Sequence, residues 1–413
     1  MLCVIIINAQ ETVYIPPGSA IQFGSTTPAG IFGYLINEGN LSIKNRGNVY
    51  FSGKIWANRE GSSLSDNNLD SNSVNGGTVH FVTNPLGQQI LDSKSSGNKG
   101  NFCNLTIDNN ADVVLVSDVT VLNTLQFKAG HILLNNHDLI IGNEWLNGNI
   151  AGYNERSFIV TGLNPTGGFV RHKSVMPGAL LTFPIGPAAS VYSPAQLINN
   201  GSQNDFYGRV FNNVYEKAVS GSILTDSTVA LTWEIAKKSV DDAEIMVRLQ
   251  NDEPIETPVF RSLRTNSYVT IFANSQWDKP FLWNPAQSPG NITSSFSIAS
   301  AIVTSRRVIL GNSLLYLSKR VSKHFKPFII PNAFSPNADN INDKWIIKGL
   351  KDYDNCKVEI FTRYGRAIFR SRGYQQPWDG TYNGSPMPVG TYYYLIDLHN
   401  GEKPLSGPLT LLR

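Results

Sequence analysis

The chain has 413 residues, a formal net charge of +3 and only 16% charged residues. This length allows two or three domains with cores of ordinary size. The low charge, with abundant Gly, Asn, Ser and Thr, is typical of extracellular β-structure rather than of a helical cytosolic enzyme. Because Lys and Arg form no block, nucleic-acid binding has no electrostatic basis in this sequence.

The first ten residues form an apolar run that ends in Asn-Ala-Gln. This pattern predicts the remnant of a secretory signal peptide over residues 1–10, cleaved just before Gln10. The run is short and lacks a basic start, which suggests that residues before Met1 are missing; the alternative is a first β-strand. No other stretch approaches the roughly 18 apolar residues of a membrane helix, so we expect no transmembrane segment.

Residues 11–165 contain one short strand after another. Asn-x-Gly turns at 37–39 and 45–47 each lead into a strand, at 41–43 and 49–51, with apolar residues two positions apart. Asn and Gly at the bends suit the stacked rungs of a β-solenoid, in which each strand buries one side. A β-sandwich is the alternative, because the repeat is irregular in length. Further strands are expected at 78–81, 105–107, 113–115, 119–121, 125–127, 132–134 and 139–141.

Residues 166–320 have longer spacings between strands, with Pro, Asp and Asn in the loops, which predicts a β-sandwich. Trp233 is expected to fill the core between its two sheets, and stacking on a ligand is the alternative. Residues 321–327 belong to a basic, mixed stretch that predicts a linker. The expected strands of this region are 181–186, 229–235, 244–249, 268–272 and 296–300.

Residues 328–413 alternate between Pro/Asn/Asp/Gly clusters and short β-branched or aromatic runs. This pattern predicts a small antiparallel β-sandwich that ends with the chain. The run contains six short motifs, which are Pro331-Asn332-Ala-Phe334-Ser-Pro336-Asn337, Asn342-Asp343, Arg363-Tyr-Gly365, Trp378-Asp379-Gly380, Gly390-Thr391-Tyr392 and the terminal Arg413.

In this order, the six motifs resemble the gliding motility-associated C-terminal domain, the type B sorting domain of Bacteroidetes type IX secretion cargo. The resemblance implies a secreted protein, extracellular or attached to the outer-membrane surface. It also implies that the type IX outer-membrane machinery recognises residues 328–413 as an export and sorting signal. That family usually has Gly where this chain has Ala338 and Asn340. Residues 102–142 more loosely resemble adhesin-like β-helical surface proteins.

The loop Asn337-x-Asp339-x-Ile341-x-Asp343 places oxygen ligands at alternate positions, one of them the Ile341 backbone carbonyl. This pattern suits Ca²⁺, although the loop lacks the Gly and the distal Glu of an EF-hand. The alternative is a polar turn held by hydrogen bonds between side chains and backbone. A Ca²⁺ ion here would have a structural role, and we expect no other cofactor.

A glycan-cleaving site on a solenoid needs two carboxylates on neighbouring rungs, or one with Lys or Arg, facing one groove. Most candidates fall at or beside corners, where Asp favours turns, and the pair His137-Asp138 is interpreted as a corner. Motifs for zinc proteases, nucleophile elbows, phosphate loops and dinucleotide binding are absent from the sequence, so we predict no enzyme activity and no catalytic residues. The candidates by location alone are Asp108, Asp112, Asp118, Asp138 and Glu144.

Aromatic side chains near loops are interpreted as packing in the core or at its rim, and stacking on sugars by exposed rings is the alternative. The Trp residues near predicted loops of the first two regions are Trp56, Trp145, Trp277 and Trp283. Cys103 and Cys356 fall in different predicted domains, so we expect no disulfide between them, and no Cys/His spacing predicts zinc.

Together these features predict an all-β, secreted, adhesin-like or structural surface protein. The alternative is a β-helix protein that binds or degrades polysaccharide, with surface polysaccharide or an extracellular glycan as its partner. The alternatives predict different surfaces: an enzyme needs clustered carboxylates on adjacent rungs, whereas a binding protein needs a flat row of exposed aromatic residues or Asn ladders.

Overall fold

The computed structural model describes residues 12–25, 28–44, 46–65, 76–94, 101–145, 147–278, 292–293, 301–312, 314–321, 330–353, 355–398 and 404–413. The chain divides into two compact units, residues 1–277 with 286–321, and residues 278–285 with 322–413. The expected signal remnant, nearly all of the expected linker, the strand at 296–300 and Trp283 lie outside the described residues.

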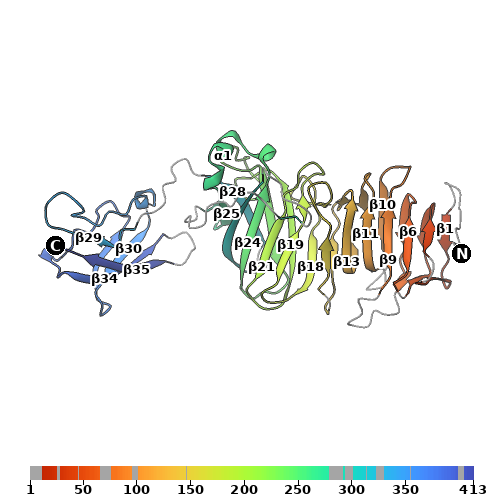
Figure 1. Ribbon diagram of the computed structural model, residues 1–413, viewed down its shortest axis with the longest axis horizontal. Helices are drawn as coiled ribbons and strands as arrows, with labels where there is room; N and C mark the ends of the chain where they lie inside the picture. The colour runs from red at the N-terminus through yellow and green to blue at the C-terminus, as the bar shows by residue number, and fades with distance from the viewer. Residues whose placement is uncertain are drawn as a thin grey trace. The chain divides into compact units, whose positions relative to one another are not determined.

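Three ladders of parallel strands form the N-terminal region, which confirms the solenoid (Figure 1). The first ladder is β1 (Thr12–Ile15), β4 (Tyr34–Asn37), β7 (Ile55–Asn58), β10 (Gln89–Ser93), β12 (Val113–Leu115), β14 (Ile132–Leu133), β17 (Ile159–Val160) and β20 (Ile185–Gly186). The second is β3 (Ala29–Ile31), β6 (Asn48–Phe51), β9 (Thr78–Val82), β11 (Phe102–Asp108), β13 (Val119–Ala129), β15 (Leu139–Ile141) and β18 (Val170–Val175), with β16 (Asn149–Ala151) also paired to β13. The third is β2 (Ala20–Phe23), β5 (Asn40–Ile43) and β8 (Ser63–Ser65).

The core of the solenoid consists of inward-facing residues stacked in register. Leu35, Trp56 and Leu91 are direct partners in neighbouring strands, and all three are fully buried. The ring centroid of Trp56 lies 5.4 Å from that of Phe51 and 5.8 Å from that of Phe102. Each rung therefore buries the apolar side of its neighbours, so the stacked rungs form the core themselves.

The parallel ladder continues past residue 165, where the solenoid was expected to end. The expected single strand at 181–186 is instead two strands in different sheets, β19 (Leu180–Phe183) and β20. Pro184 separates them and has no N–H to donate to a ladder. β20 pairs in parallel with β17, so the last rung of the solenoid reaches Gly186.

The β-sandwich grows out of the second ladder at β18, which pairs in parallel with β15 and antiparallel with β22. Its first sheet continues through β22 (Asn204–Asn212), β23 (Leu231–Lys237), β28 (Leu315–Arg320), β25 (Tyr268–Ala273) and β26 (Gln276–Trp277). Its second sheet is β19, β21 (Ala195–Asn199), β24 (Ala243–Asn251) and β27 (Ile302–Leu310). Between β24 and β25 lie α1 (Pro258–Ser262) and the 3₁₀ turns η2 (Glu253–Ile255) and η3 (Arg264–Asn266). Trp233 fills the interior as expected, and its Nε1 donates to the Ser193 carbonyl at 2.9 Å.

The C-terminal unit is a five-stranded sheet with its own core. The strand order is β29 (Ala333–Phe334), β35 (Leu405–Leu411), β34 (Gly390–Asp397), β30 (Lys357–Phe361) and β31 (Ala367–Arg372). All pairs are antiparallel except β29 with β35. The hairpin of β32 (Thr381–Tyr382) and β33 (Ser385–Pro386) and the 3₁₀ turn η4 (Leu350–Asp352) complete the unit.

Candidate functional site

Two buried tryptophans organise the motif residues of the C-terminal unit. The Trp345 backbone N–H donates to the Trp378 carbonyl at 2.8 Å, and Trp345 Nε1 donates to the Pro331 carbonyl at 2.7 Å. The Tyr374 hydroxyl donates to the Trp345 carbonyl at 2.7 Å. Two motifs far apart in sequence, those of Pro331 and Trp378, are therefore joined through Trp345 by hydrogen bonds at an apolar core, where such bonds are strongest.

The first motif lies beside the end of the chain. The Thr410 N–H donates to the Asn332 carbonyl at 2.7 Å, and the Leu412 N–H donates to the Phe334 carbonyl at 2.9 Å. Gly380 adopts φ 79°, and a Cβ there would lie 2.9 Å from Cγ of Pro336, so the turn after Trp378 has room only for glycine. The first motif, the turn after Trp378 and the last residues of the chain therefore lie together.

Several of the other motif residues are exposed to solvent. Arg363 and Gly365 lie in the turn between β30 and β31, where the Arg363 guanidinium stacks 5.3 Å from the ring centroid of Tyr364, which is 86% exposed. Thr391 is exposed on β34, whereas its neighbour Tyr392 is buried. Arg413 Nη2 donates to the Met387 carbonyl at 3.0 Å. These exposed residues are the part of the motif set that another protein can contact.

The loop from Asn337 to Asp343 is closed by its own hydrogen bonds. Asp343 accepts from the Ala338 N–H at 2.7 Å and the Asn340 N–H at 2.8 Å. Asp339 accepts from the Ile341 N–H at 2.7 Å and from the Asn337 amide at 2.9 Å, and these bonds lower the pKa of Asp339 below its ordinary value. All four carboxylate oxygens thus have a donor within the loop, which is the geometry of a polar turn.

Asn342 completes this loop, because its carbonyl accepts from the Ser335 N–H at 3.0 Å. Asp379 holds a second turn, in which one carboxylate oxygen accepts from the Thr381 N–H at 3.0 Å. Within the described ranges, no group of three or more His, Cys, Asp or Glu side chains is arranged to hold a metal ion. Calcium binding by the loop stays a prediction.

Three of the five candidate carboxylates of the solenoid hold its corners. The carboxylate of Asp112 accepts from the His131 N–H at 2.8 Å, that of Asp118 from the Asp138 N–H at 2.9 Å, and that of Asp138 from the Phe169 N–H at 2.7 Å. Each bond joins one rung to the next along the stack. These carboxylates therefore satisfy backbone donors that a bend leaves without a ladder partner.

The remaining candidates are on the surface. Asp108 is half-buried and lies 4.0 Å from Nζ of Lys128, and Glu144 is exposed. The His137 ring lies 3.8 Å from Asp118 on the preceding rung. The five carboxylates are thus spread along the stack in separate contacts.

The structure separates the tryptophans that could bind sugars. Trp56 is fully buried, which confirms packing in the core for this residue: the alternation of β7 points it inward. Trp145 is 74% exposed. Trp277 is half-buried, and its Nε1 donates to the Tyr215 carbonyl at 2.7 Å. Of these three, only Trp145 offers a largely exposed ring.

A stacked pair of rings on the outer face of the second ladder was missed in the sequence. Tyr50 and His80 are partners in β6 and β9, and their rings stack at 4.5 Å with an interplanar angle of 10°. Tyr50 is 40% exposed, and the His80 Nε2 lies 2.8 Å from Oδ1 of Asn48. Both residues occupy the third position of alternating strands, so a parallel register would have placed them together.

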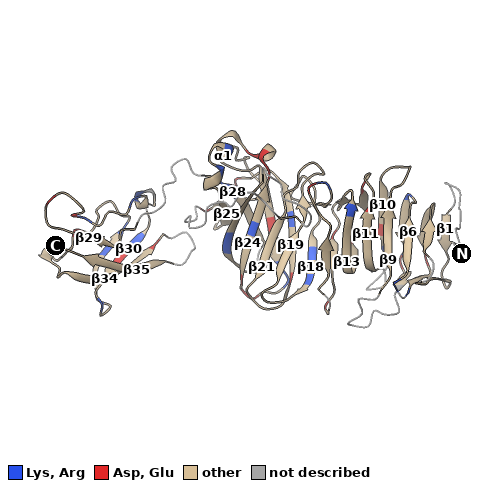
Figure 2. Cartoon of the chain, viewed as in Figure 1, with Lys and Arg blue, Asp and Glu red and all other residues tan. Residues whose placement is uncertain are grey.

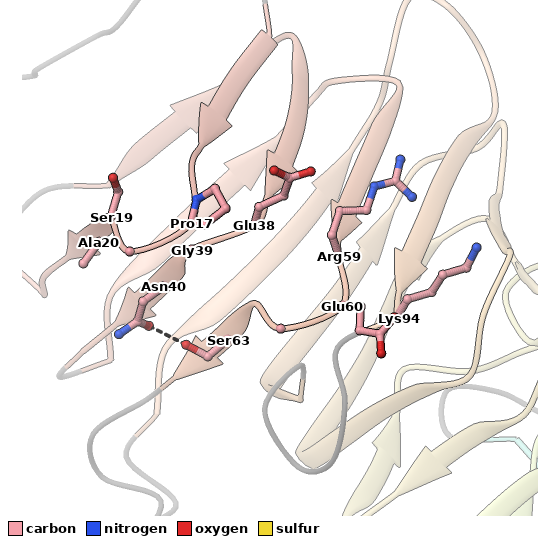
Figure 3. A pocket seen from close by; sticks show the side chains of 12 residues that line it. Pro17, Ser19, Ala20, Glu38, Gly39, Asn40, Arg59, Glu60, Ser63 and Lys94 are labelled. Carbon is pink, nitrogen blue, oxygen red and sulfur yellow. Dashed lines mark hydrogen bonds between the residues drawn. The ribbon is translucent and has the colours of Figure 1, made fainter.

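A groove crosses the corners of four successive rungs near the N-terminus and encloses about 810 Å³. Figure 3 shows Glu38, Arg59 and Lys94 extending from the bends that follow β4, β7 and β10. Arg59 Nη1 contacts the Asp92 carboxylate at 2.9 Å. The groove is polar and carries both signs of charge, so it has no preference for a strongly charged polymer.

Residues 328–411 match the family of the CHU_C Type IX secretion signal domain. This match confirms the resemblance of the C-terminal run, and the chain is therefore a type IX secretion cargo with a C-terminal sorting signal. Such a cargo interacts with the type IX secretion machinery and is exported to the extracellular space or the cell surface. No protein of curated function and no solved structure matches this chain.

Two general features complete the description. Lys and Arg are scattered over strands and loops in Figure 2 rather than gathered on one element. In the part of the chain that the structure describes, no helix combines the length and hydrophobicity needed to cross a bilayer.

Proposed function

We propose that the exported chain is an adhesin-like surface protein of a Bacteroidetes bacterium, and that its solenoid and sandwich act by binding rather than by catalysis. The corner bonds of Asp112, Asp118 and Asp138 carry this proposal. A glycosidase needs two carboxylates directed at one substrate bond, whereas these three are engaged by backbone N–H groups of separate rungs. A rigid stack with long outer rows of side chains suits contact with an extended partner.

Localisation of the chain with and without residues 325–413, in a bacterium that has this secretion system, tests the export step. We expect the full chain on the surface or in the medium and the shortened chain in the periplasm. Attachment of the cells to a surface is then measured after deletion of the first 320 residues. An equal location for both forms would contradict the export role, and unchanged attachment would contradict the adhesin role.

A pair of matched variants separates the motif from general surface charge. Arg363→Ala removes an exposed motif residue, and Arg372→Ala removes an exposed arginine of the same unit that lies outside the motif. We expect reduced export for Arg363→Ala only. Equal export of both variants would show that this turn is not contacted by the machinery.

The specific alternative is polysaccharide binding by the stacked rings of Tyr50 and His80. The two rings are nearly parallel and stacked on each other, and Tyr50 is partly exposed, so the pair offers an aromatic surface to the face of a sugar ring. Retention of the full chain on a panel of polysaccharides tests this alternative. We expect Tyr50→Ala to weaken retention several-fold and Tyr364→Ala, which removes an exposed ring of the sorting domain, to leave it unchanged. No retention of the parent chain on any polysaccharide would exclude the alternative.

A further inference from the structure

A buried lysine lies near a hydrogen-bonded pair of buried asparagine and glutamate side chains at one end of the interior of the β-sandwich. Lys319 and Asn251 are fully buried, and Glu256 is 5% exposed. Lys319 follows Leu315 and Leu317 at alternate positions of β28, so its side chain points into the same interior. Asn251 follows Leu249 on β24 of the opposite sheet and points inward for the same reason.

The amine of Lys319 reaches across the interior to β24, which carries Asn251, and to its neighbour β27. Its Nζ donates to the Ile302 carbonyl at 2.7 Å and to the Leu249 carbonyl at 3.4 Å. Ile302 is the direct partner of Asn251 in the β24–β27 ladder, and such partners have Cα atoms roughly 4.5–5.5 Å apart. The amine therefore bonds to the carbonyls of the residue two before Asn251 and of its ladder partner, on the side of the sheet to which Asn251 points.

Glu256 joins the same space from the neighbouring chain segment. The Val229 N–H donates to the Lys319 carbonyl at 3.0 Å, and Val229 also forms a β-bridge with Glu256. Paired residues in adjacent segments project to the same face, so Lys319 and Glu256 flank Val229 on the interior side. One oxygen of Glu256 accepts from the Asn251 amide at 2.7 Å and from Arg264 Nη2 at 2.8 Å.

Two polar atoms of this cluster are buried without a hydrogen-bond partner among the described residues, Oε2 of Glu256 and Oδ1 of Asn251. Unpaired buried atoms of this kind call for an explanation. Burial lowers the pKa of Lys319 well below its ordinary value, and the Glu256 charge acts in the opposite direction. Desolvation of this kind eases the loss of a proton from the ammonium, which leaves a nucleophilic amine.

We propose that Lys319 and Asn251 form an intramolecular amide bond, with Glu256 as the proton carrier. Glu256 takes a proton from the Lys319 ammonium, and the Nζ lone pair attacks Cγ of Asn251. Glu256 gives this proton to Nδ2, the bond from Cγ to Nδ2 breaks, and Nδ2 leaves as ammonia. Glu256 then carries the second proton of the amine to the ammonia, which becomes ammonium. One ammonium is released for each amide bond formed, and no oxidant or reductant takes part.

The intact mass of the purified full chain tests the proposal directly. We expect a mass lower by one ammonia than the mass calculated for the chain as purified. In a tryptic digest we expect no cleavage after Lys319 and a branched peptide that joins residues 249–261 to residues 308–320. A succinimide elsewhere also loses ammonia, but it leaves the bond after Lys319 open to trypsin. An unreduced mass with normal cleavage after Lys319 would overturn the proposal.

Four variants assign the roles of the groups. Lys319→Met, Asn251→Ala and Glu256→Gln are each expected to keep the full mass of their sequence, because each lacks one participant. Lys237→Met is the matched control, since Lys237 is also a buried lysine, with its Nζ bonded to the Ser239 carbonyl at 2.7 Å. Loss of ammonia should persist in this control. A branched peptide retained in Asn251→Ala would refute the assigned partner, and one retained in Glu256→Gln would refute the assigned proton carrier. The parent mass decides the central claim even if a variant fails to fold.

Discussion

At the scale of single residues, the turns of the sorting domain contain backbone conformations that favour glycine. Ala338 and Asn340 both have φ 68°, in the left-handed region, and they occupy the two positions where the related domains usually have Gly. A Cβ in this region costs roughly 1–2 kcal/mol, less for Asn than for Ala. This chain keeps the loop geometry with less suitable residues, because the carboxylate of Asp343 holds the loop through two N–H groups.

Ala338→Gly is therefore expected to stabilise the C-terminal unit. Relief of the left-handed strain exceeds the added entropy of the unfolded chain by about 0.5–1 kcal/mol. The melting temperature of this unit, followed by calorimetry of the full chain, measures the gain. Gly365→Ala is the matched control: Gly365 has φ 78° with open space around it, so it should lose about 1 kcal/mol. A lower melting temperature for Ala338→Gly would contradict the argument.

His172 should make the stability of the first unit depend on pH. Burial lowers the pKa of His172 to about 3, with a smaller opposing effect from the Thr182 backbone. The unfolded value is about 6.5, so the unfolded chain binds the proton more tightly. The contribution of neutral His172 to the free energy of unfolding is therefore complete above about pH 6.5. It falls below this pH by at most about 1.4 kcal/mol per pH unit.

Urea unfolding of the full chain at pH 7 and pH 5 measures this dependence. His172→Leu removes the titrating group and should show a smaller loss between the two pH values than the parent. Equal losses in the parent and the variant would mean that His172 binds its proton about as tightly in the folded state as in the unfolded state.

At the scale of elements, the solenoid is held by bonds that run between its corners. Asp138 connects three rungs, because its N–H donates to Asp118 and its carboxylate accepts from the Phe169 N–H and contacts Arg171. The side chain replaces a ladder partner that the bend removes. We therefore expect position 138 to tolerate a neutral side chain that accepts a hydrogen bond better than an apolar side chain.

Asp138→Ala should accordingly destabilise the first unit by about 1 kcal/mol, since it leaves the partly buried Phe169 N–H without its acceptor. Asp138→Asn keeps the acceptor and should cost less. Chemical unfolding of both variants gives the comparison. Equal costs would point to the ion pair with Arg171, rather than the bond to Phe169, as the main contribution.

At the scale of the whole molecule, the two units have separate cores. The first combines solenoid and sandwich in one apolar cluster, because β18 belongs to both. The second contains the buried tryptophans Trp345 and Trp378. A domain with its own core can fold alone, which suits a signal that must be recognised whatever it is attached to.

Removal of residues 322–413 is therefore expected to leave the melting temperature of the first unit within about 2 °C of its value in the full chain. Calorimetry should show that one transition disappears and another stays. A large shift of the remaining transition would mean that the first unit depends on the second for stability.

Local patterns in the sequence were sufficient for several features of this protein. Alternation and Asn-x-Gly bends predicted the strands that include Val49 and Val79. The period of two that defines a strand can be recognised within a few consecutive residues. The order of motifs from Pro331 to Arg413 was sufficient to predict the sorting domain, since each motif is a short turn or strand with its own characteristic residues.

Only the tertiary structure decided which distant residues meet. It placed Trp56 in the core, stacked Tyr50 on His80, and brought Asn251 and Lys319 to one buried space. It also carried the parallel ladder past residue 165 to Gly186. These features depend on the register between strands and on the packing of two sheets, and register is set by long-range pairing that no short stretch of sequence contains.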